Sequence, residues 1–288
     1  MAEIAALVVP YELGRLRDGV GCGPEHLLEG GAAVALASAG ADVRTELIEL
    51  EPRFAATGLG EADAAFELIR LVMDRVRAAR ERGAFPVVFA GSCFNAVGSI
   101  MALNDPALGV VYFDAHPDFS EPATTTSGYF DSMGLAVLTG GAWQAMLAGI
   151  PGARAVPEGR VVLAGARDFD PSERRRVEDS EIVHLGADRL RSPDALIATL
   201  RAMRPAISSL YVHLDLDVLD SAEATVNIYA SSDGVRADGL VGLVEALFRE
   251  FRVAGVSLTA YDPSYDEGDR VPPIANRVLE AIARRVAV

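Results

Sequence analysis

The sequence reads LGVVYFDAHPD over residues 108–118, an apolar run that ends in three polar side chains at alternate positions. A second run, LYVHLDLD over residues 210–217, ends in the same way. In an extended chain, residues two apart share one face. Each run therefore predicts a buried strand whose polar end points a row of carboxylates and imidazoles, which are common metal ligands, in one direction.

Similar apolar runs recur along the chain and alternate with amphipathic segments of helical period. We expect strands near residues 4–9, 43–50, 86–90, 108–114, 160–165, 181–185, 210–217 and 253–261, and helices near 61–82, 238–251 and 274–286. Parallel strands that are covered on both faces read as nearly continuous apolar runs. The pattern therefore predicts an α/β fold, a three-layer αβα arrangement around a mainly parallel sheet of about eight strands. No strong linker interrupts the 288 residues, so we expect a single domain over residues 1–288.

The composition narrows the class of protein. A formal net charge of −15 disfavours a nucleic-acid partner, which needs a basic surface. The sequence contains no lysine, which excludes Schiff-base, pyridoxal-phosphate and P-loop chemistry. We find no apolar stretch of spanning length and no secretory leader, so we expect no membrane partner and a cytoplasmic location. Two cysteines, Cys22 and Cys93, do not suggest a disulfide framework.

Polar clusters follow four of the predicted strands. Besides the two runs quoted above, they are GSCFN at residues 91–95 and RDFDPSE at residues 167–173. Functional groups gather beyond the carboxyl ends of parallel strands, so we expect these clusters to meet at one edge of the sheet. One Asp-x-Asp at a strand end is commonly a loop cap. Two converging rows of aspartate and histidine instead favour a pair of divalent ions, which can activate a water for hydrolysis.

Six motifs resemble the ureohydrolases, the family of arginase, agmatinase and formiminoglutamase. They are GV--GP at residues 19–24, AGSC at 90–93, DAHPD at 114–118, TSG at 126–128, RD-D at 167–170 and D-D at 215–217. The resemblance implies an αβα fold, two Mn(II) ions, a small-molecule substrate and a homo-oligomer, either a trimer or a hexamer. It implies six metal ligands, which are Cys93, Asp114, His116, Asp118, Asp215 and Asp217. Of these, Asp114 and Asp215 are implied to bridge both ions.

The sequence departs from the family pattern at three positions. Cys93 replaces a histidine ligand, and because a thiolate suits Mn²⁺ less well than imidazole, we expect a first metal site that is weak, empty or selective for another metal. The alternative for Cys93 is a buried, unreactive side chain. Asp131 replaces a histidine of arginases; it is expected either to act with Asp118 in catalysis, relaying protons, or to cap the segment 132–138. Ala260 replaces the acid that holds the guanidinium.

Other positions match the family's contacts to the amino-acid end of the substrate. Asp170 and Glu173 match acids that bind an α-ammonium group, and Thr125 and Ser127 match hydroxyls near an α-carboxylate. The segment 170–173 is equally a good helix start, which needs no ligand. We expect His213 to hydrogen-bond a ligand carboxylate, with direct metal coordination as the alternative.

The sequence thus predicts an enzyme, a metal-dependent amidinohydrolase that cleaves a linear carbon–nitrogen bond in a guanidino, N-hydroxyguanidino or formimino compound. The missing acid at Ala260 favours a modified head group, as in hydroxyarginine. A hydroxyarginine hydrolase of antibiotic biosynthesis is similar in having a cysteine at the first ligand position. A rival prediction, motivated by Cys93 and Ala260, is a degenerate, metal-poor homologue with a binding or regulatory role.

Overall fold

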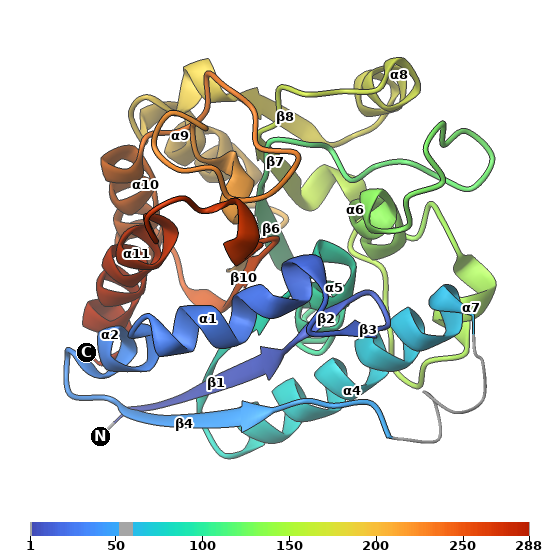
Figure 1. Cartoon of the computed structure of the whole chain (residues 1–288). Coiled ribbons are helices and arrows are strands. Elements are labelled where there is room, and N and C mark those ends of the chain that lie inside the picture. Colours follow the sequence, from blue (N-terminus) through green and yellow to red (C-terminus); the bar gives the residue numbers. More distant parts are fainter. Residues whose placement is uncertain (1, 52–59, 288) are drawn as a thin grey trace.

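One sheet of eight strands runs through the middle of the molecule in the computed structural model, which describes residues 2–51 and 60–287 (Figure 1). Along the sheet the strand order is β4-β1-β5-β10-β9-β6-β7-β8, and every neighbouring pair is parallel. The predicted α/β class and the strand number are confirmed. The expected single domain over 1–288 stays a proposal, and residues 1, 52–59 and 288 lie outside the described part.

The strands begin and end within a few residues of the predicted runs. They are β1 (Glu3–Val9), β4 (Asp42–Leu47), β5 (Phe85–Ala90), β6 (Leu108–Phe113), β7 (Val161–Gly165), β8 (Val183–Gly186), β9 (Ser209–Asp215) and β10 (Val253–Thr259), with β2 (Tyr11–Glu12) and β3 (Arg15–Leu16) forming a separate antiparallel pair. The run 253–261 ends early because Ala260 turns the backbone into the left-handed region, with φ of 64°.

Ten α-helices cover the sheet in the described residues. They are α1 (Gly23–Glu29), α2 (Ala32–Ala37), α4 (Glu61–Glu81), α5 (Cys93–Met101), α6 (Gly134–Leu138), α7 (Gln144–Ala148), α8 (Pro171–Asp179), α9 (Asp194–Met203), α10 (Ala237–Glu250) and α11 (Val271–Val286). The three helices predicted from amphipathic period correspond to α4, α10 and α11. Over the described ranges, none is both long and apolar enough to cross a bilayer.

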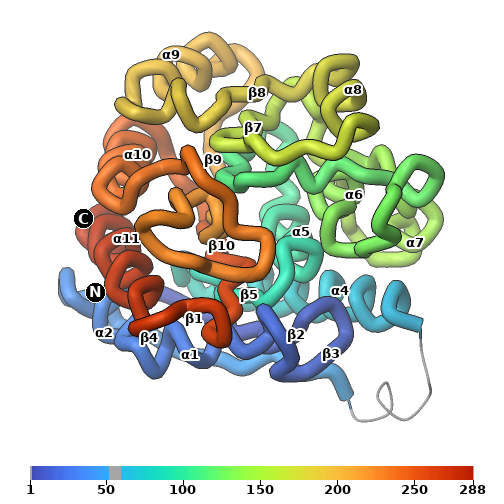
Figure 2. Tube along the Cα trace, turned by 45° about the horizontal axis from the view of Figure 1, so that its top comes forward, coloured from blue at the N-terminus to red at the C-terminus, as the bar shows by residue number. Residues whose placement is uncertain are grey.

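Two apolar cores lie on opposite faces of the sheet, as alternation along the strands requires. In β5, Val88 and Ala90 pack with α4, α5 and α6, whereas Val87 and Phe89 pack with α2, α10 and α11. Figures 1 and 2 show these two groups of helices on the two sides of the central strands. The predicted three-layer αβα arrangement is therefore confirmed.

The strand order creates a switch point in the middle of the sheet. The chain passes from β5 to β6, and β9 and β10 later fill the two places between them. The carboxyl ends of these four neighbouring strands therefore meet, which is where ligands bind in open α/β sheets.

Gly91 makes the turn from β5 into α5 possible. A β-carbon at this position would lie 2.3 Å from Tyr11 O and 2.8 Å from Gly21 Cα. The Gly91 backbone instead joins three segments, since its N–H donates to Val9 O (3.1 Å) and its carbonyl accepts from Ala260 N (2.8 Å). The start of α5 is thereby fixed against the end of β10.

Candidate metal centre

Cys93 begins α5 directly beyond the end of β5. Ser92 caps this helix by accepting a hydrogen bond from Asn95 N at 3.4 Å. Cys93 is buried, and its Sγ lies 2.9 Å from Asp215 Oδ2 on β9. The helix start and a strand that are far apart in sequence therefore meet through these two side chains.

Asp114, His116 and Asp118 follow β6 in a tight loop. Asp114 Oδ1 accepts a hydrogen bond from His116 N at 2.7 Å, which turns the chain immediately after the strand. Asp118 has a left-handed backbone, with φ of 47°. The three side chains thus lie beyond the strand, and the predicted extended row is wrong for this segment.

The second row also folds back at its end. Asp215 closes β9, and its Oδ1 accepts a hydrogen bond from Asp217 N at 2.7 Å within the short 3-10 helix η5 (Leu216–Val218). Asp217 Oδ1 accepts from Ala115 N at 3.1 Å, and its Oδ2 lies 3.2 Å from His116 Nδ1. Hydrogen bonds to the carboxylates, together with the strand register, bring the two rows into contact.

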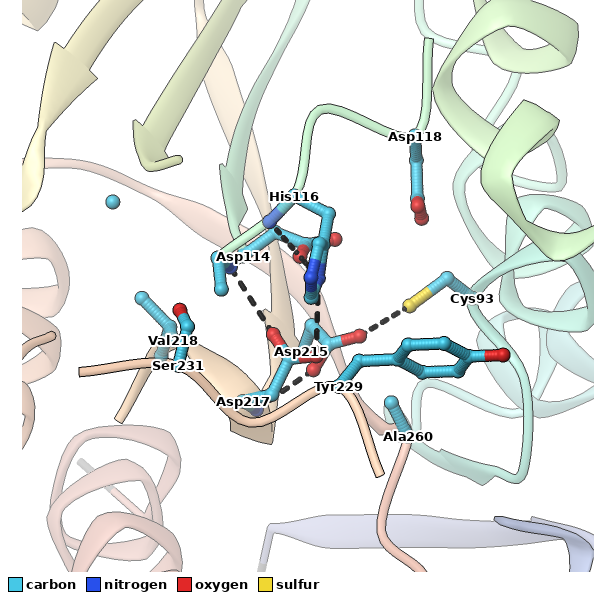
Figure 3. A network of polar contacts seen from close by, with 12 residues as sticks. Cys93, Asp114, His116, Asp118, Asp215, Asp217, Val218, Tyr229, Ser231 and Ala260 are labelled. Carbon is cyan, nitrogen blue, oxygen red and sulfur yellow. Dashed lines mark hydrogen bonds and ion pairs between the residues drawn. The ribbon is translucent and has the colours of Figure 1, made fainter. Parts of the chain in front are cut away.

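Figure 3 shows the six predicted metal ligands gathered in one place. A cavity of about 190 Å³ opens above them. The predicted site residues that line it are His116, Asp118, Ser127, Asp131, Glu173, Asp215 and Asp217. The rest of the wall consists of Val20, Tyr129, Ser132, Asn227, Tyr229 and Ala260. Cys93 and Asp114 are buried beside these residues.

Burial dominates the ionisation of the carboxyl groups. Desolvation raises the pKa of Asp114 to about 7, and the charge of Asp217 adds to this shift. Burial also raises the pKa of Asp118 and Asp215 well above their usual range. Burial alone would lower the pKa of His116, but the charges of Asp217 and Asp114 raise it to about 12. The protein groups by themselves therefore retain protons that a divalent cation would displace.

One buried oxygen atom of the cluster indicates that these residues fit a cation. Asp114 Oδ2 is buried and has no hydrogen-bond partner among the described residues. A buried oxygen without a donor is costly, whereas a divalent ion would satisfy it. Asp114, His116 and Asp217 also bring their ligand atoms within 4.8 Å of one another. The donor set therefore fits a divalent cation.

Asp131 holds the N-terminal end of α5. Its Oδ1 accepts from Phe94 N at 2.7 Å and its Oδ2 accepts from Cys93 N at 3.3 Å. The suggested cap of the segment 132–138 is wrong, because the carboxylate satisfies the free N–H groups of a different helix. Burial nevertheless raises the pKa of Asp131 to about 7. A cavity-lining carboxyl group with this pKa can exchange a proton near neutrality.

Asp170 and Glu173 form the start of α8. Asp170 accepts from Ser172 N and Glu173 reaches back to Asp170 N, so the predicted helix start is a complete capping box. Asp170 Oδ2 also accepts from Thr126 Oγ1 at 2.7 Å. Glu173 is buried, and its Oε1 accepts from Ser120 Oγ at 2.7 Å. Of the two acids, Glu173 lines the cavity and Asp170 does not.

Thr125 and Ser127 shape the loop that precedes Tyr129. Thr125 Oγ1 accepts from Gly128 N at 3.0 Å, and Ser127 Oγ accepts from Tyr129 N at 3.1 Å. Ser127 belongs to the cavity wall, and Thr125 is outside it. The four predicted substrate contacts thus separate into two cavity residues and two that support the surrounding loops.

Sequence reasoning missed three residues that hold the carboxylates in place. Tyr112 donates its hydroxyl to Asp118 Oδ2 at 2.8 Å, and Asn227 donates Nδ2 to Asp217 Oδ2 at 3.2 Å. Tyr112 shares its strand face with Asp114, so alternation could have revealed it, whereas no local pattern marks Asn227. Arg167, quoted above only as part of a motif, donates to carbonyls around the loop after β9, including Asp217 O at 3.1 Å.

His213 has different neighbours from those expected. Its Nδ1 lies 2.8 Å from Ser257 Oγ and its Nε2 lies 3.3 Å from Cys93 Sγ. The predicted hydrogen bond to a ligand carboxylate is wrong, because the strand register sets His213 beside Ser257 on β10 and Tyr112 on β6. Burial lowers the pKa of His213 to about 3, so the ring is neutral.

Two tyrosines form the outer wall of the cavity. The rings of Tyr129 and Tyr229 lie 5.7 Å apart, and Tyr229 meets the His116 ring edge-on at 6.1 Å. Tyr229 is 49% exposed, so it faces both solvent and cavity. An aromatic pair at the entrance offers π faces to a cationic or planar head group.

The chain is similar in sequence and in fold to known proteins. The model of the arginase family matches residues 2–284. An arginase of Eremothecium gossypii is 28% identical over 270 residues, which cover 88% of this chain and 66% of that protein. The chain therefore spans slightly less than two thirds of the length of this relative.

Two further proteins resemble the chain over much of its length. An N(omega)-hydroxy-L-arginine amidinohydrolase of Streptomyces lavendulae is 30% identical over 188 residues, 64% of this chain and 62% of that protein. The crystal structure of an arginase from Bacillus cereus matches with a TM-score of 0.88 and 24% identity over 98% of both chains. At this identity the structural match shows the fold alone.

Proposed function

Since this chain belongs to the arginase family over residues 2–284, we propose that it hydrolyses a linear carbon–nitrogen bond in a small guanidino-type substrate. The preferred substrate in this proposal is an α-amino acid with an N-hydroxyguanidino head group. Water adds to the amidine carbon, the bond from that carbon to the side-chain nitrogen breaks, and the nitrogen leaves as an amine after gaining a proton. The second product is then hydroxyurea.

The observation that carries the proposal is the convergence of carboxylates, an imidazole and a thiol beneath one cavity, with Asp114 Oδ2 buried and without a partner. Two Mn²⁺ ions are the proposed cofactor. Cys93, Asp114, Asp118 and Asp215 would hold the first, and His116, Asp114, Asp215 and Asp217 the second. When bound, such ions supply Lewis-acid activation of water and polarisation of the substrate.

The side chains around the cavity supply the remaining chemistry in this proposal. Asp131 accepts a proton from the attacking water or returns one to the leaving nitrogen, since burial raises its pKa to about 7. Glu173 binds the α-ammonium group of the substrate from the cavity wall, and Ser127 binds its α-carboxylate. Asp170 and Thr125 support this wall through their loop hydrogen bonds.

The wall around the head group favours a modified guanidine. Ala260 presents a methyl group to the cavity, and the aromatic rings of Tyr129 and Tyr229 stand nearby. A plain guanidinium carries a full charge and needs a carboxylate partner when buried. An N-hydroxyguanidine is less basic because its oxygen withdraws electrons, so it enters more readily without a dedicated acid.

The rival function, a binding protein without catalysis, has one observation in its favour. Burial raises the pKa of the Cys93 thiol well above its ordinary value, and the neighbouring charge of Asp215 adds to this shift. A protonated thiol is a poor metal ligand. Metal analysis separates the two functions: fewer than one ion per chain after incubation with Mn²⁺ favours the binding protein.

Activity is the direct test. With Mn²⁺ present, we expect release of hydroxyurea from N-hydroxyarginine to exceed release of urea from arginine under matched conditions. Asp215→Ala should abolish both reactions, because this carboxylate contributes to both proposed ion sites. Glu223→Ala, outside the cavity wall, is the control for expression and folding. Intact metal loading with no turnover of either substrate would reject the hydrolase.

Ala260→Glu tests the head-group assignment separately. A carboxylate at the cavity wall should raise turnover of arginine relative to N-hydroxyarginine, by up to about tenfold for one new charge-assisted hydrogen bond. Ala260→Gln, which has similar size and no charge, is the matched control. An unchanged ratio of the two rates would remove the electrostatic basis for preferring a modified guanidine.

The remaining features of the protein follow from the same proposal. A cavity of about 190 Å³ suits a small-molecule substrate. We propose a homo-oligomer, a trimer or a hexamer, and a cytoplasmic location. Light scattering on the purified chain measures the assembly, and a monomeric mass would reject it.

A further inference from the structure

His213 is a buried imidazole that the proposed two-ion core leaves unused. It lies in the middle of β9 and is fully buried, between Tyr112 on β6 and Ser257 on β10. Its ring stacks on the Tyr112 ring with centroids 4.1 Å apart and 24° between the planes. Stacking and burial hold the ring in one orientation, with one nitrogen toward β10 and the other toward α5.

The neighbours of the ring fit the tautomer that carries its proton on Nδ1. Ser257 Oγ lies 2.8 Å from His213 Nδ1 and can accept that proton. The lone pair of Nε2 then points at Cys93. A hydrogen bond that fixes one ring nitrogen so that the other is a free donor atom is the usual arrangement of histidine metal ligands.

Several polar groups crowd the Cys93 sulfur. Its Sγ lies 2.9 Å from Asp215 Oδ2, 3.0 Å from Thr259 Oγ1 and 3.3 Å from His213 Nε2. In the same cluster, Asp114 Oδ2 is buried and has no hydrogen-bond partner among the described residues. A cation would satisfy all of them at once.

Three of the groups in this cluster are close enough to share one ion. Ligand atoms of Cys93, Asp114 and His213 all lie within 4.8 Å of one another. Asp114, His116 and Asp217 form a second such group. The two groups share Asp114 but differ in chemistry, since only the first contains sulfur.

We propose that Cys93, His213 and Asp114 form a nitrogen–sulfur–oxygen site that takes a borderline divalent ion such as Zn²⁺ or Co²⁺, beside an oxygen-rich site that takes Mn²⁺. The inference rests on the metal core of the proposed function, but it replaces the first of the two Mn²⁺ ions and adds His213 as a ligand, so that β9 supplies the imidazole absent at position 93. On binding, a sulfur–metal bond forms, the S–H bond breaks and its proton leaves to solvent. Thiolate and imidazole ligands favour such ions over Mn²⁺.

Cobalt absorption tests the site without depending on catalysis. Titration of Co²⁺ into the chelator-treated protein should produce a sulfur-to-cobalt charge-transfer band. Cys93→Ser should remove the band. His213→Ala should weaken Co²⁺ binding by about 10- to 100-fold and change the visible ligand-field bands, without changing Mn²⁺ binding at the His116 and Asp217 side. The control for loss of a histidine is His184→Ala, which removes an exposed imidazole on β8 that lies 2.8 Å from Ala166 O.

Two results would overturn the proposal. One is Co²⁺ binding to the wild-type protein without a sulfur band; the other is an unchanged Co²⁺ affinity and spectrum in His213→Ala. If that variant fails to fold, X-ray absorption of His116→Ala with one equivalent of Zn²⁺ decides the question. A sulfur at about 2.3 Å and an imidazole at about 2.0 Å support His213, and loss of the imidazole signal rejects it.

The outcomes also separate this site from the proposed hydrolase. One outcome is a sulfur band that depends on His213 in a protein that turns over neither guanidino substrate. That result supports the metal site and rejects the hydrolase. Turnover with Mn²⁺ by a protein that shows no sulfur band does the reverse.

Discussion

The hydroxyl of Tyr112 donates to Asp118 Oδ2 at 2.8 Å, inside the protein and from the strand that carries the ligand loop. Both groups are buried, with exposed fractions of 0% and 8%. This bond holds the side chain of Asp118, a proposed metal ligand. The backbone carbonyl of Asp118 accepts hydrogen bonds from Leu135 N and Ala136 N at the start of α6. The orientation of Asp118 is thus set before any cation binds.

Tyr112→Phe removes this support. We expect a loss of about 1–3 kcal/mol in the free energy of unfolding, together with about tenfold weaker metal binding. Urea denaturation and isothermal titration calorimetry measure the two effects. Tyr261→Phe is the matched control, because its hydroxyl also donates to a buried carboxylate, Asp266 Oδ2 at 2.9 Å. Equal loss of metal affinity in both variants would contradict a local role for Tyr112.

The metal-free protein should lose stability as the pH rises from about 6.5 to about 8. Burial raises the folded-state pKa of Asp114 and Asp131 to about 7. Burial alone would lower the folded-state pKa of His116, but the charge of Asp217 raises it to about 12. The folded chain therefore binds more protons than the unfolded chain in this window. His213, with a pKa of about 3, acts in the opposite direction only below about pH 6.5.

Denaturation in chelator at several pH values measures this slope. Saturating Mn²⁺ should flatten or reverse it, because binding displaces the protons. Asp131→Asn should reduce the slope in chelator alone. A stability that rises with pH in the metal-free protein across this window would show that these carboxyl groups are ionised in the folded state.

Arg167 clamps the loop after β9 through its guanidinium. Its donors reach the carbonyls of Asp217, Leu219, Ser231 and Ser232 at 2.8–3.1 Å. Arg167→Ala should cost about 3 kcal/mol or more, since it leaves several carbonyl groups unpaired, and it should weaken metal binding at the Asp217 side.

Arg174→Ala provides the comparison for Arg167. The guanidinium of this exposed arginine lies 4.5 Å from the centre of the Phe169 ring, so its removal should change stability by less than about 1 kcal/mol. Thermal unfolding with and without Mn²⁺ reports both effects. A loss of stability in Arg167→Ala without any change in metal affinity would restrict the clamp to a folding role.

Gly91→Ala should destabilise the fold by about 2 kcal/mol or more, because the new methyl group would meet backbone atoms of Tyr11 and Gly21. Gly242→Ala is the opposite case. It lies within α10 with no atom within 4 Å of its would-be β-carbon, and it should gain about 0.5–1 kcal/mol from helix propensity. Chemical denaturation compares the two. Similar effects in both variants would mean that the turn into α5 adapts.

Much of the fold follows from local periodicity. The strands β1, β5 and β6 and the helices α4 and α11 begin and end close to the predicted runs. A strand or helix that is buried on one or two faces repeats apolar residues at a regular spacing, which can be recognised in the sequence. Short helices such as α1, α2 and α6 carry too few turns to show such a period. The left-handed turn at Ala260 was not predicted because alanine rarely adopts it.

In the candidate site, the sequence predicted the metal ligands but not the residues that support them. Asp114, His116, Asp118, Asp215 and Asp217 stand out because metal-ligand side chains cluster just after apolar runs. Their supports do not stand out. Tyr112, Asn227 and Arg167 are ordinary residues in the sequence, and they acquire their roles only through hydrogen bonds that span up to 65 residues.

The sequence by itself determined that two rows of ligands end two buried strands, because alternation and apolar runs are properties of neighbouring residues. Only the tertiary structure decided which groups surround Cys93. The strand order inserts β9 and β10 between β5 and β6, and this sets His213 and Asp215, more than 100 residues away in the chain, against one sulfur. Contacts of this range depend on how strands pair, and no local pattern encodes that pairing.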